Sequence, residues 1–157
     1  MADAADPAPD QTPDRSPDKL SLVVYDRHFD KVHYALVMAS AAAAIGRPAT
    51  LFFTMEACRA LVAAQGDGPP GWAAMPLSDG PGTGAERDAH YKSKKLATFE
   101  ELLSACVAMD VRFLVCEMGL RAIGLERARL RADVPIEEGG VVTYLSDASK
   151  DGAMVFI

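Results

Sequence analysis

Short apolar runs alternate with segments of helical periodicity from residue 20 to the end of the chain. Four of these runs are five or six residues long and rich in β-branched and aromatic residues, which is typical of buried strands. The segments between them repeat their apolar residues at helical spacing. Strands that alternate with helices predict an α/β fold, a three-layer sandwich with a mostly parallel five-stranded sheet. The predicted strands are 20–25, 49–54, 112–116, a shorter extended piece at 134–136, and 153–157.

Local signals place the ends of several helices. Thr98, with Glu101 three residues later, has the pattern of a capping box that begins a helix. Asp30 is available as the N-cap of the helix after the first strand, and Gly46 and Pro48 end that helix. Further helices are predicted at 55–63, at 118–123 and around 141–145.

Composition divides the chain into three parts. Residues 1–19 hold four of the ten prolines and five aspartates, against one arginine and one lysine, so half of the net charge of −6 lies there. Such a segment buries too little apolar surface to offset the entropy of ordering it. We therefore expect a disordered acidic tail at 1–19 and a single domain at 20–157. Within that domain, the long loop at about 64–95 is rich in glycine and proline, and either works as a lid or contains structure of its own.

Charge and cysteine content exclude several classes of function. The net charge of −6 argues against a nucleic-acid partner, since phosphate contacts need clustered lysine and arginine. No apolar run is long enough to span a membrane and the start does not resemble a signal peptide, so no stable membrane insertion is expected. Three cysteines without a CxxC motif do not form a disulfide framework. We expect no metal site, no cofactor, and a cytoplasmic domain with reduced thiols.

Cys116 is the strongest candidate for a reactive residue. Reactive groups in parallel sheets collect beyond the carboxyl ends of the strands, and Cys116 ends the run 112–116 just before a predicted helix. The N–H groups and dipole of a helix N-terminus favour the nucleophilic thiolate, whereas the adjacent Glu117 opposes it. The alternative is a buried structural cysteine, since free cysteine is among the most buried residue types. Cys58 and Cys106 have apolar helical surroundings and are interpreted as core residues.

The same rule about strand ends gives weaker candidates. His28 follows the first strand, where it would orient a substrate or act as an acid or base, and an ordinary surface histidine is the alternative. Asp26 lies in the same loop, and the same two interpretations, a functional residue or an ordinary surface residue, apply to it. The supporting positions predicted at strand ends are Asp26, His28, Thr54, Glu117, Met118 and Gly119.

Six short segments follow one another in a characteristic order and spacing, although none is specific alone. They are Asp30-Lys31 before the Ala-rich helix that ends at Gly46, 51–54, Met75-Pro76, 98–102, 115–118 with Gly124, and 139–141. Together they resemble the DsrE/DsrF-like family of sulfur-carrier and sulfurtransferase proteins. The resemblance covers 20–157 and is closest to the subgroup with a long central loop.

This resemblance implies a flavodoxin-like or Rossmann-like topology and assembly into a homo-oligomer. It also implies that Cys116 accepts sulfane sulfur as a persulfide and passes it to a partner thiol, with sulfur donor and acceptor proteins as partners. Gly119 and Leu120 stand where the subgroup usually has a small polar residue and a second methionine. Lys92 and Lys94, at the basic end of the long loop, would then stabilise negative charge near the sulfur, and a solvated basic stretch is the alternative.

Two other functions remain open. A non-catalytic subunit, or a small-ligand binding or assembly protein in sulfur metabolism, would use exposed apolar surface as an interface. A peroxide-reducing thiol enzyme would need a second cysteine to resolve the sulfenic acid. By chain order, Cys106 is the only nearby candidate for that second cysteine.

Overall fold

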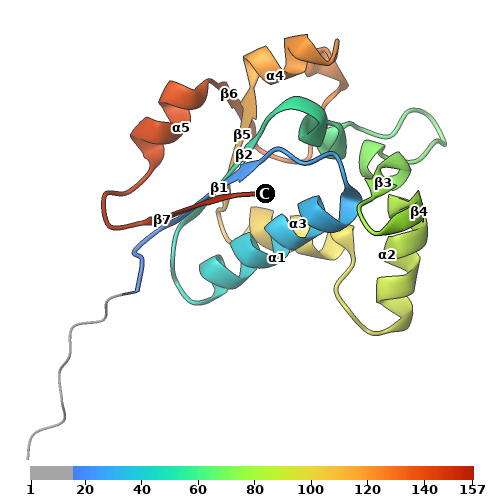
Figure 1. The fold of residues 1–157 in the computed structure, drawn as a ribbon, viewed down its shortest axis with the longest axis horizontal. Helices are drawn as coiled ribbons and strands as arrows, with labels where there is room; N and C mark the ends of the chain where they lie inside the picture. Colours follow the sequence, from blue (N-terminus) through green and yellow to red (C-terminus); the bar gives the residue numbers. More distant parts are fainter. Residues whose placement is uncertain (1–15) are drawn as a thin grey trace, which may run out of the picture.

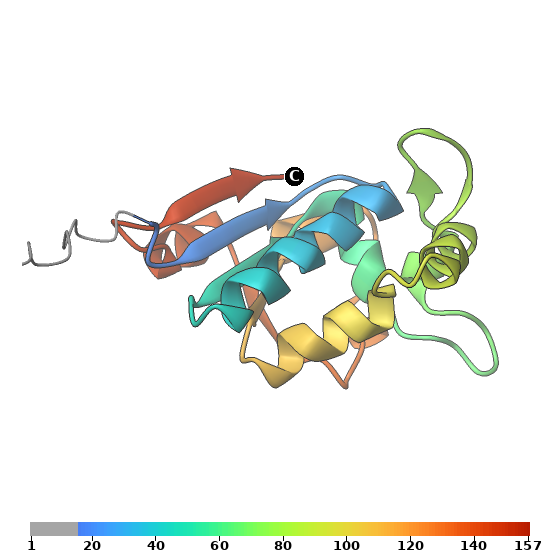
Figure 2. The same cartoon turned by 90° about the horizontal axis from the view of Figure 1, so that it is seen from below.

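The computed structural model describes residues 16–157. Its elements, with η for 3-10 helices, are β1 (Leu20–Val24), α1 (Phe29–Ala44), β2 (Ala49–Phe53), η1 (Met55–Leu61), η2 (Gly71–Ala74), β3 (Pro76–Leu77), β4 (Gly80–Thr83), α2 (Gly84–Ser93), α3 (Phe99–Ala108), β5 (Arg112–Cys116), α4 (Glu117–Ala122), η3 (Arg127–Arg129), β6 (Ile136–Gly139), α5 (Val141–Asp147) and β7 (Ala153–Phe156). A parallel sheet in the order β6-β5-β2-β1-β7 forms the middle layer (Figure 1). Helices α1 and α3 pack together on one face, and α5 lies on the other (Figures 1 and 2). The predicted α/β fold with a five-stranded parallel sheet is confirmed.

The side chains of β5 alternate between the two faces of the sheet. Val115 is buried in the larger core cluster, which lies between the sheet and the α1–α3 layer. Leu114 and Cys116 belong instead to a smaller cluster with Phe52 of β2 and Tyr144 of α5. Because successive residues of a strand face opposite sides, the register of β5 places Cys116 on the α5 face.

The stretch at about 64–95 contains structure of its own. It holds η2, the antiparallel hairpin β3–β4 and the ten-residue helix α2. Thr83 begins α2 with a capping box, since its hydroxyl accepts from the N–H of Glu86 and the Glu86 carboxylate accepts from the N–H of Thr83. Glycine is required at the next position, because a Cβ on Gly84 would lie 2.2 Å from the carbonyl oxygen of Trp72. What composition suggested to be a long loop is thus a folded insertion.

The helix start predicted at Asp30 is wrong. Helix α1 begins at Phe29, with His28 at the N-cap position, so Asp30 lies inside the first turn. The Asp30 carboxylate accepts hydrogen bonds from the hydroxyl and, at 2.8 Å, the backbone N–H of Ser78 in the β3–β4 hairpin. A contact distant in sequence therefore occupies the carboxylate that local capping would have used.

Other predicted boundaries lie closer to the structure. The capping box of Thr98 and Glu101 is confirmed at the start of α3. The extended piece predicted at 134–136 is displaced toward the C-terminus, since β6 starts at Ile136, which pairs with Phe113 of β5. None of the helices within residues 16–157 is both long and apolar enough to cross a membrane.

The described residues begin inside the predicted tail. Residues 1–15, most of that tail, lie outside them. The Ser149 hydroxyl donates to Asp18 over 2.8 Å, and Lys19 Nζ lies 2.8 Å from a carboxylate oxygen of Asp147. The packed part of the chain therefore starts before the boundary predicted at residue 20.

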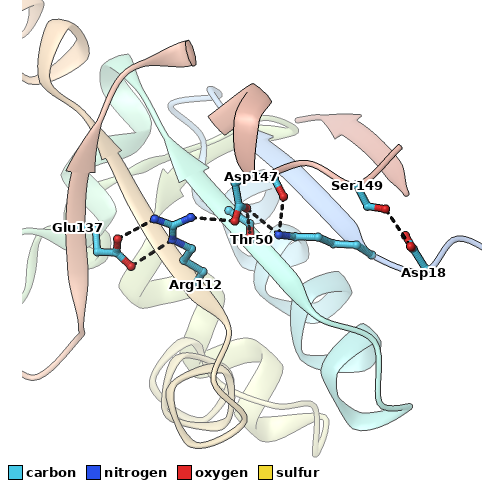
Figure 3. Close-up of polar contacts among 7 residues, drawn as sticks. Asp18, Thr50, Arg112, Glu137, Asp147 and Ser149 are labelled. Carbon is cyan, nitrogen blue, oxygen red and sulfur yellow. Dashed lines mark hydrogen bonds and ion pairs between the residues drawn. The ribbon is translucent and has the colours of Figure 1, made fainter. Parts of the chain in front are cut away.

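Asp147, the last residue of α5, ties this helix to the sheet (Figure 3). Its carboxylate accepts hydrogen bonds from the Thr50 hydroxyl at 2.6 Å and Arg112 Nη1 at 2.7 Å, besides its ion pair with Lys19. Arg112 continues the network with two hydrogen bonds to Glu137. Burial raises the pKa of Asp147, but its hydrogen-bond donors outweigh burial and lower the pKa from 3.8 to about 2.

The substitution Asp147→Asn should make the protein less stable at neutral pH. The folded pKa of about 2 lies below the unfolded value of 3.8, so the contribution is complete above about pH 5 and is lost as the pH falls toward 2. We expect the variant to lose on the order of 2 kcal/mol of unfolding free energy at about pH 7 and almost nothing near pH 2. Urea denaturation across this range measures the difference. The matched control is Asp79→Asn, which breaks the more exposed ion pair with Arg87, and equal losses in both variants would contradict the prediction.

Candidate functional site at the end of β5

Cys116 lies where β5 ends and α4 begins. It is the N-cap residue of α4, and its Sγ accepts a hydrogen bond from the backbone N–H of Gly119 at 3.4 Å. The residue is 1% exposed and packs with Phe52, Leu114 and Tyr144. A persulfide or thiolate at this position would be close to the same N–H donor.

The start of α4 rests on the end of β2. A Cβ on Gly119 would lie 2.6 Å from the backbone nitrogen of Met55 and 2.8 Å from Thr54 Oγ1, so only glycine allows this approach. Met55 has a φ of 50°, in the left-handed region that is costly for residues with a side chain. Three predicted site residues, Thr54, Cys116 and Gly119, are thus brought together.

Asp26 and His28 form a pair in the loop after β1. Oδ1 of Asp26 lies 2.6 Å from Nδ1 of His28 and accepts from the His28 backbone N–H at 2.8 Å. Both residues line a pocket of about 270 Å³, together with Met55 and Glu56. Because Met55 also contacts the start of α4, it links this pocket to the surroundings of Cys116. The carboxylate fixes the orientation of the imidazole, as in acid–base pairs.

The remaining predicted site residues lie on the surface. Glu117 and Met118 are exposed in the first turn of α4, whereas Lys92 and Lys94 are exposed at the end of α2. Helix α2 packs against η2, and Figures 1 and 2 show it on the opposite side of the molecule from α5. Among the described residues, no contact joins either lysine to Cys116, so the structure does not bring these positive charges to the sulfur.

The other two cysteines have different positions relative to Cys116. Cys106, on α3, directs its Sγ at the carbonyl oxygen of Leu36 in α1, and burial raises its pKa to about 12. The pKa of Cys58, on η1, is also raised to about 12, first by burial and next by the charge of Cys116. Both Cys58 and Cys106 belong to the larger core cluster, whereas Cys116 belongs to the smaller one.

The surroundings of Cys116 are mostly apolar. The Tyr144 hydroxyl is buried and has no hydrogen-bond partner among the described residues, an arrangement that costs about 1–3 kcal/mol. Within residues 16–157, no group of three or more His, Cys, Asp or Glu side chains is placed to hold a metal ion. A negative charge on Cys116 Sγ would thus be stabilised by the hydrogen bond from the Gly119 N–H.

A comparison with family models matches residues 71–156 to the DsrE/DsrF/DrsH-like family. The matched part is more than half of the chain. The chain belongs to this family. Membership of the DsrE/DsrF/DrsH-like family suggests a role in sulfur metabolism. A comparison with curated proteins finds no match.

The match to the DsrE/DsrF/DrsH-like family runs from η2 to β7 and so includes Cys116, α4 and α5. The strands β1 and β2, and with them the Asp26–His28 pair, Thr54 and Cys58, lie outside the matched residues. The contact between Gly119 and Thr54 therefore joins the part of the chain that carries the family match to a part that the match does not cover.

Gly119→Ala should destabilise the protein, because its new methyl group would meet backbone and the buried side chain of Thr54. We expect a loss of about 1–3 kcal/mol of unfolding free energy, typical of overpacking. Gly140→Ala is the control, since nothing lies within 4 Å of the Cβ position there, and it should cost less than about 1 kcal/mol. Urea unfolding measures both values, and a Gly119→Ala variant as stable as the control would show that α4 does not need this contact.

Proposed function

We propose that the protein is a sulfur carrier or sulfurtransferase that holds sulfane sulfur as a persulfide on Cys116 and passes it to a partner thiol. The observation that carries the proposal is the hydrogen bond from the Gly119 N–H to Cys116 Sγ, in a chain of the DsrE/DsrF/DrsH-like family. The partners are a sulfur donor and a sulfur acceptor protein, and the chemistry requires no cofactor. The three free cysteines suit a reducing, cytoplasmic setting.

Transfer consists of two displacements that balance without an added oxidant or reductant. In loading, the Cys116 thiolate attacks the outer sulfur of a donor persulfide, a new S–S bond forms, and the donor departs as a thiolate. In delivery, the acceptor thiolate attacks the outer sulfur and Cys116 departs as a thiolate. The Gly119 N–H stabilises the charge on Cys116 when it enters and leaves this cycle.

Access to the thiol requires a local opening, because Cys116 is 1% exposed. Cys116 packs against Tyr144 of α5 and directly precedes the six-residue helix α4, so this opening involves one of these two short helices. We assign donor or acceptor binding to the pocket of Asp26 and His28, because its wall residue Met55 contacts the start of α4.

Exposure of the full chain to a small persulfide should add about 32 Da, one sulfur atom, at Cys116. Cys116→Ser should lower the stoichiometry of loading at least about tenfold, since the thiolate is the attacking group. Cys106→Ser is the matched control, because Cys106 is buried under α1 in the layer on the other side of the sheet. Intact-mass and peptide mass spectrometry measure the loading, and a Cys116→Ser protein that takes up sulfur like the wild type would overturn the proposal.

We also propose that two copies of this chain associate through the apolar surface on the Cys116 face of the sheet. In the parallel register Phe156 pairs with Val23, which packs against the Cys116 cluster, so Phe156 lies on that face. Phe156 is 68% exposed and contacts the exposed ring of Tyr25, with 5.4 Å between the ring centroids. Further exposed apolar residues on β7 and α5 are Met154, Val142 and Leu145. An interface here would cover apolar surface that is otherwise exposed to water.

Phe156→Glu should weaken self-association about 30-fold or more, because a charge placed in an apolar interface loses at least about 2 kcal/mol. Ile45→Glu is the control, since Ile45 is equally exposed but follows α1 on the other face. Sedimentation equilibrium gives the association constants. Equal constants for the two variants, or a monomeric wild type, would exclude this interface. A self-associating protein whose Cys116 takes up no sulfur would instead be a non-catalytic subunit.

A further inference from the structure

The pocket of Asp26 and His28 also contains an arginine without a partner. Arg27 lines the same pocket of about 270 Å³ and is exposed, and no group in the described part of the chain forms an ion pair or hydrogen bond with it. Both carboxylates of this pocket are engaged. Asp26 lies 2.6 Å from the ring of His28, and Glu56 lies 2.6 Å from Arg59. The positive charge of Arg27 is therefore the one that an anionic ligand would neutralise.

His28 adds an unused hydrogen-bond acceptor to this pocket. Its Nδ1 lies 2.6 Å from the Asp26 carboxylate and donates to it, which leaves Nε2 of the neutral ring with a lone pair. Among the described residues, none forms a hydrogen bond with Nε2. The side chain of His28 is 32% exposed, so a molecule from solution can reach the ring. The pocket thus offers a ligand one cation and one acceptor.

A second pocket, of about 180 Å³, adjoins the first. The two pockets share Arg27 and Glu56, and Arg59 and Gly71 line the second one as well. A Cβ on Gly71 would lie 2.2 Å from the carbonyl oxygen of Arg59, so η2 packs directly on η1 at this point. This close packing fixes the wall of the second pocket, which provides room for the remainder of a small ligand.

We infer that this site binds a small thiol that carries a carboxylate, a molecule of the type of an N-acylated cysteine. The carboxylate pairs with Arg27, and the thiol S–H donates a hydrogen bond to Nε2 of His28. Tyr25 and Met55, which also line the pocket, provide apolar contact for the carbon chain between these two groups. Cavities of this size suit a molecule of low mass. Such a thiol is a sulfur acceptor for the delivery step, a use that rests on the proposed function.

Isothermal titration calorimetry of the full chain tests the inference with three probes. N-acetylcysteine has both groups, N-acetylcysteine amide lacks the carboxylate, and N-acetyl-S-methylcysteine lacks the S–H. We expect N-acetylcysteine to bind at least about tenfold more tightly than the amide, because the amide cannot form the charge-assisted pair with arginine. It should bind about threefold more tightly than the S-methyl compound, which loses one neutral hydrogen bond.

Two variants assign these preferences to their residues. Arg27→Gln should remove the preference for the carboxylate, and His28→Leu should remove the preference for the S–H. Lys150→Gln is the matched control for charge, since Lys150 is exposed and lies outside both pockets, and it should keep both preferences. Equal affinities of the wild type for N-acetylcysteine and its amide, or an unchanged preference in Arg27→Gln, would overturn the inference. Absence of binding by all three probes would also overturn it and leave the pocket to a partner protein.

The binding and loading experiments fail independently of each other. If N-acetylcysteine does not bind but Cys116 takes up sulfur, this inference fails and the carrier proposal stands. If it binds as expected but Cys116 takes up no sulfur, the thiol site stands and the carrier proposal fails. Where both hold, transfer of sulfur from loaded Cys116 to N-acetylcysteine below saturation should be about tenfold slower in Arg27→Gln than in Lys150→Gln. Equal rates would overturn the role of the site in delivery.

Discussion

Gly119 holds the start of α4 against Thr54 and Met55 at a distance that leaves no room for a side chain. This backbone contact fixes the first turn of α4, and the same turn supplies the N–H that reaches Cys116 Sγ. Met55 adopts a positive φ at the same point, so two segments with unusual backbone requirements meet there. Such conformations persist where the surrounding packing enforces them. The candidate site therefore depends first on backbone geometry, and the chemistry of the thiol follows from it.

The helix that covers the thiol is anchored at the opposite end of the sheet. Tyr144 of α5 packs in the Cys116 cluster, and Asp147, one turn later, receives hydrogen bonds from Thr50 and Arg112 near the starts of β2 and β5. The ion pairs of Asp147 thus lie near the strand starts, whereas Cys116 lies in an apolar cluster at the end of β5. This separation matters because an unpaired charge in apolar surroundings is costly, so a charged sulfur there relies on the few N–H groups that face it.

Periodicity was sufficient to predict the α/β sheet and to place Cys116 at a strand end, because a strand buried on both faces is a short apolar run. The capping box at Thr98 was equally visible, since its signal spans only four residues. Asp30 failed as a cap because Ser78, distant in sequence, uses its carboxylate. The close approach of Gly119 to Met55 could not be predicted, since it depends on how η1 and α4 pack rather than on any local pattern. The same holds for the elements within 64–95, whose glycines and prolines permit tight turns but do not specify them.

Of the three cysteines, we propose Cys116 as the thiol that reagents and partners can reach. All three cysteines are free and buried, but Cys116 lies at the start of the short helix α4, whereas Cys106 lies in the packed core. Peptide-resolved alkylation of the native protein by iodoacetamide compares them directly. We predict that Cys116 is labelled at least about tenfold faster than Cys106 under native conditions and at a similar rate in denaturant. Equal labelling of both cysteines at the rate of global unfolding would contradict the claim.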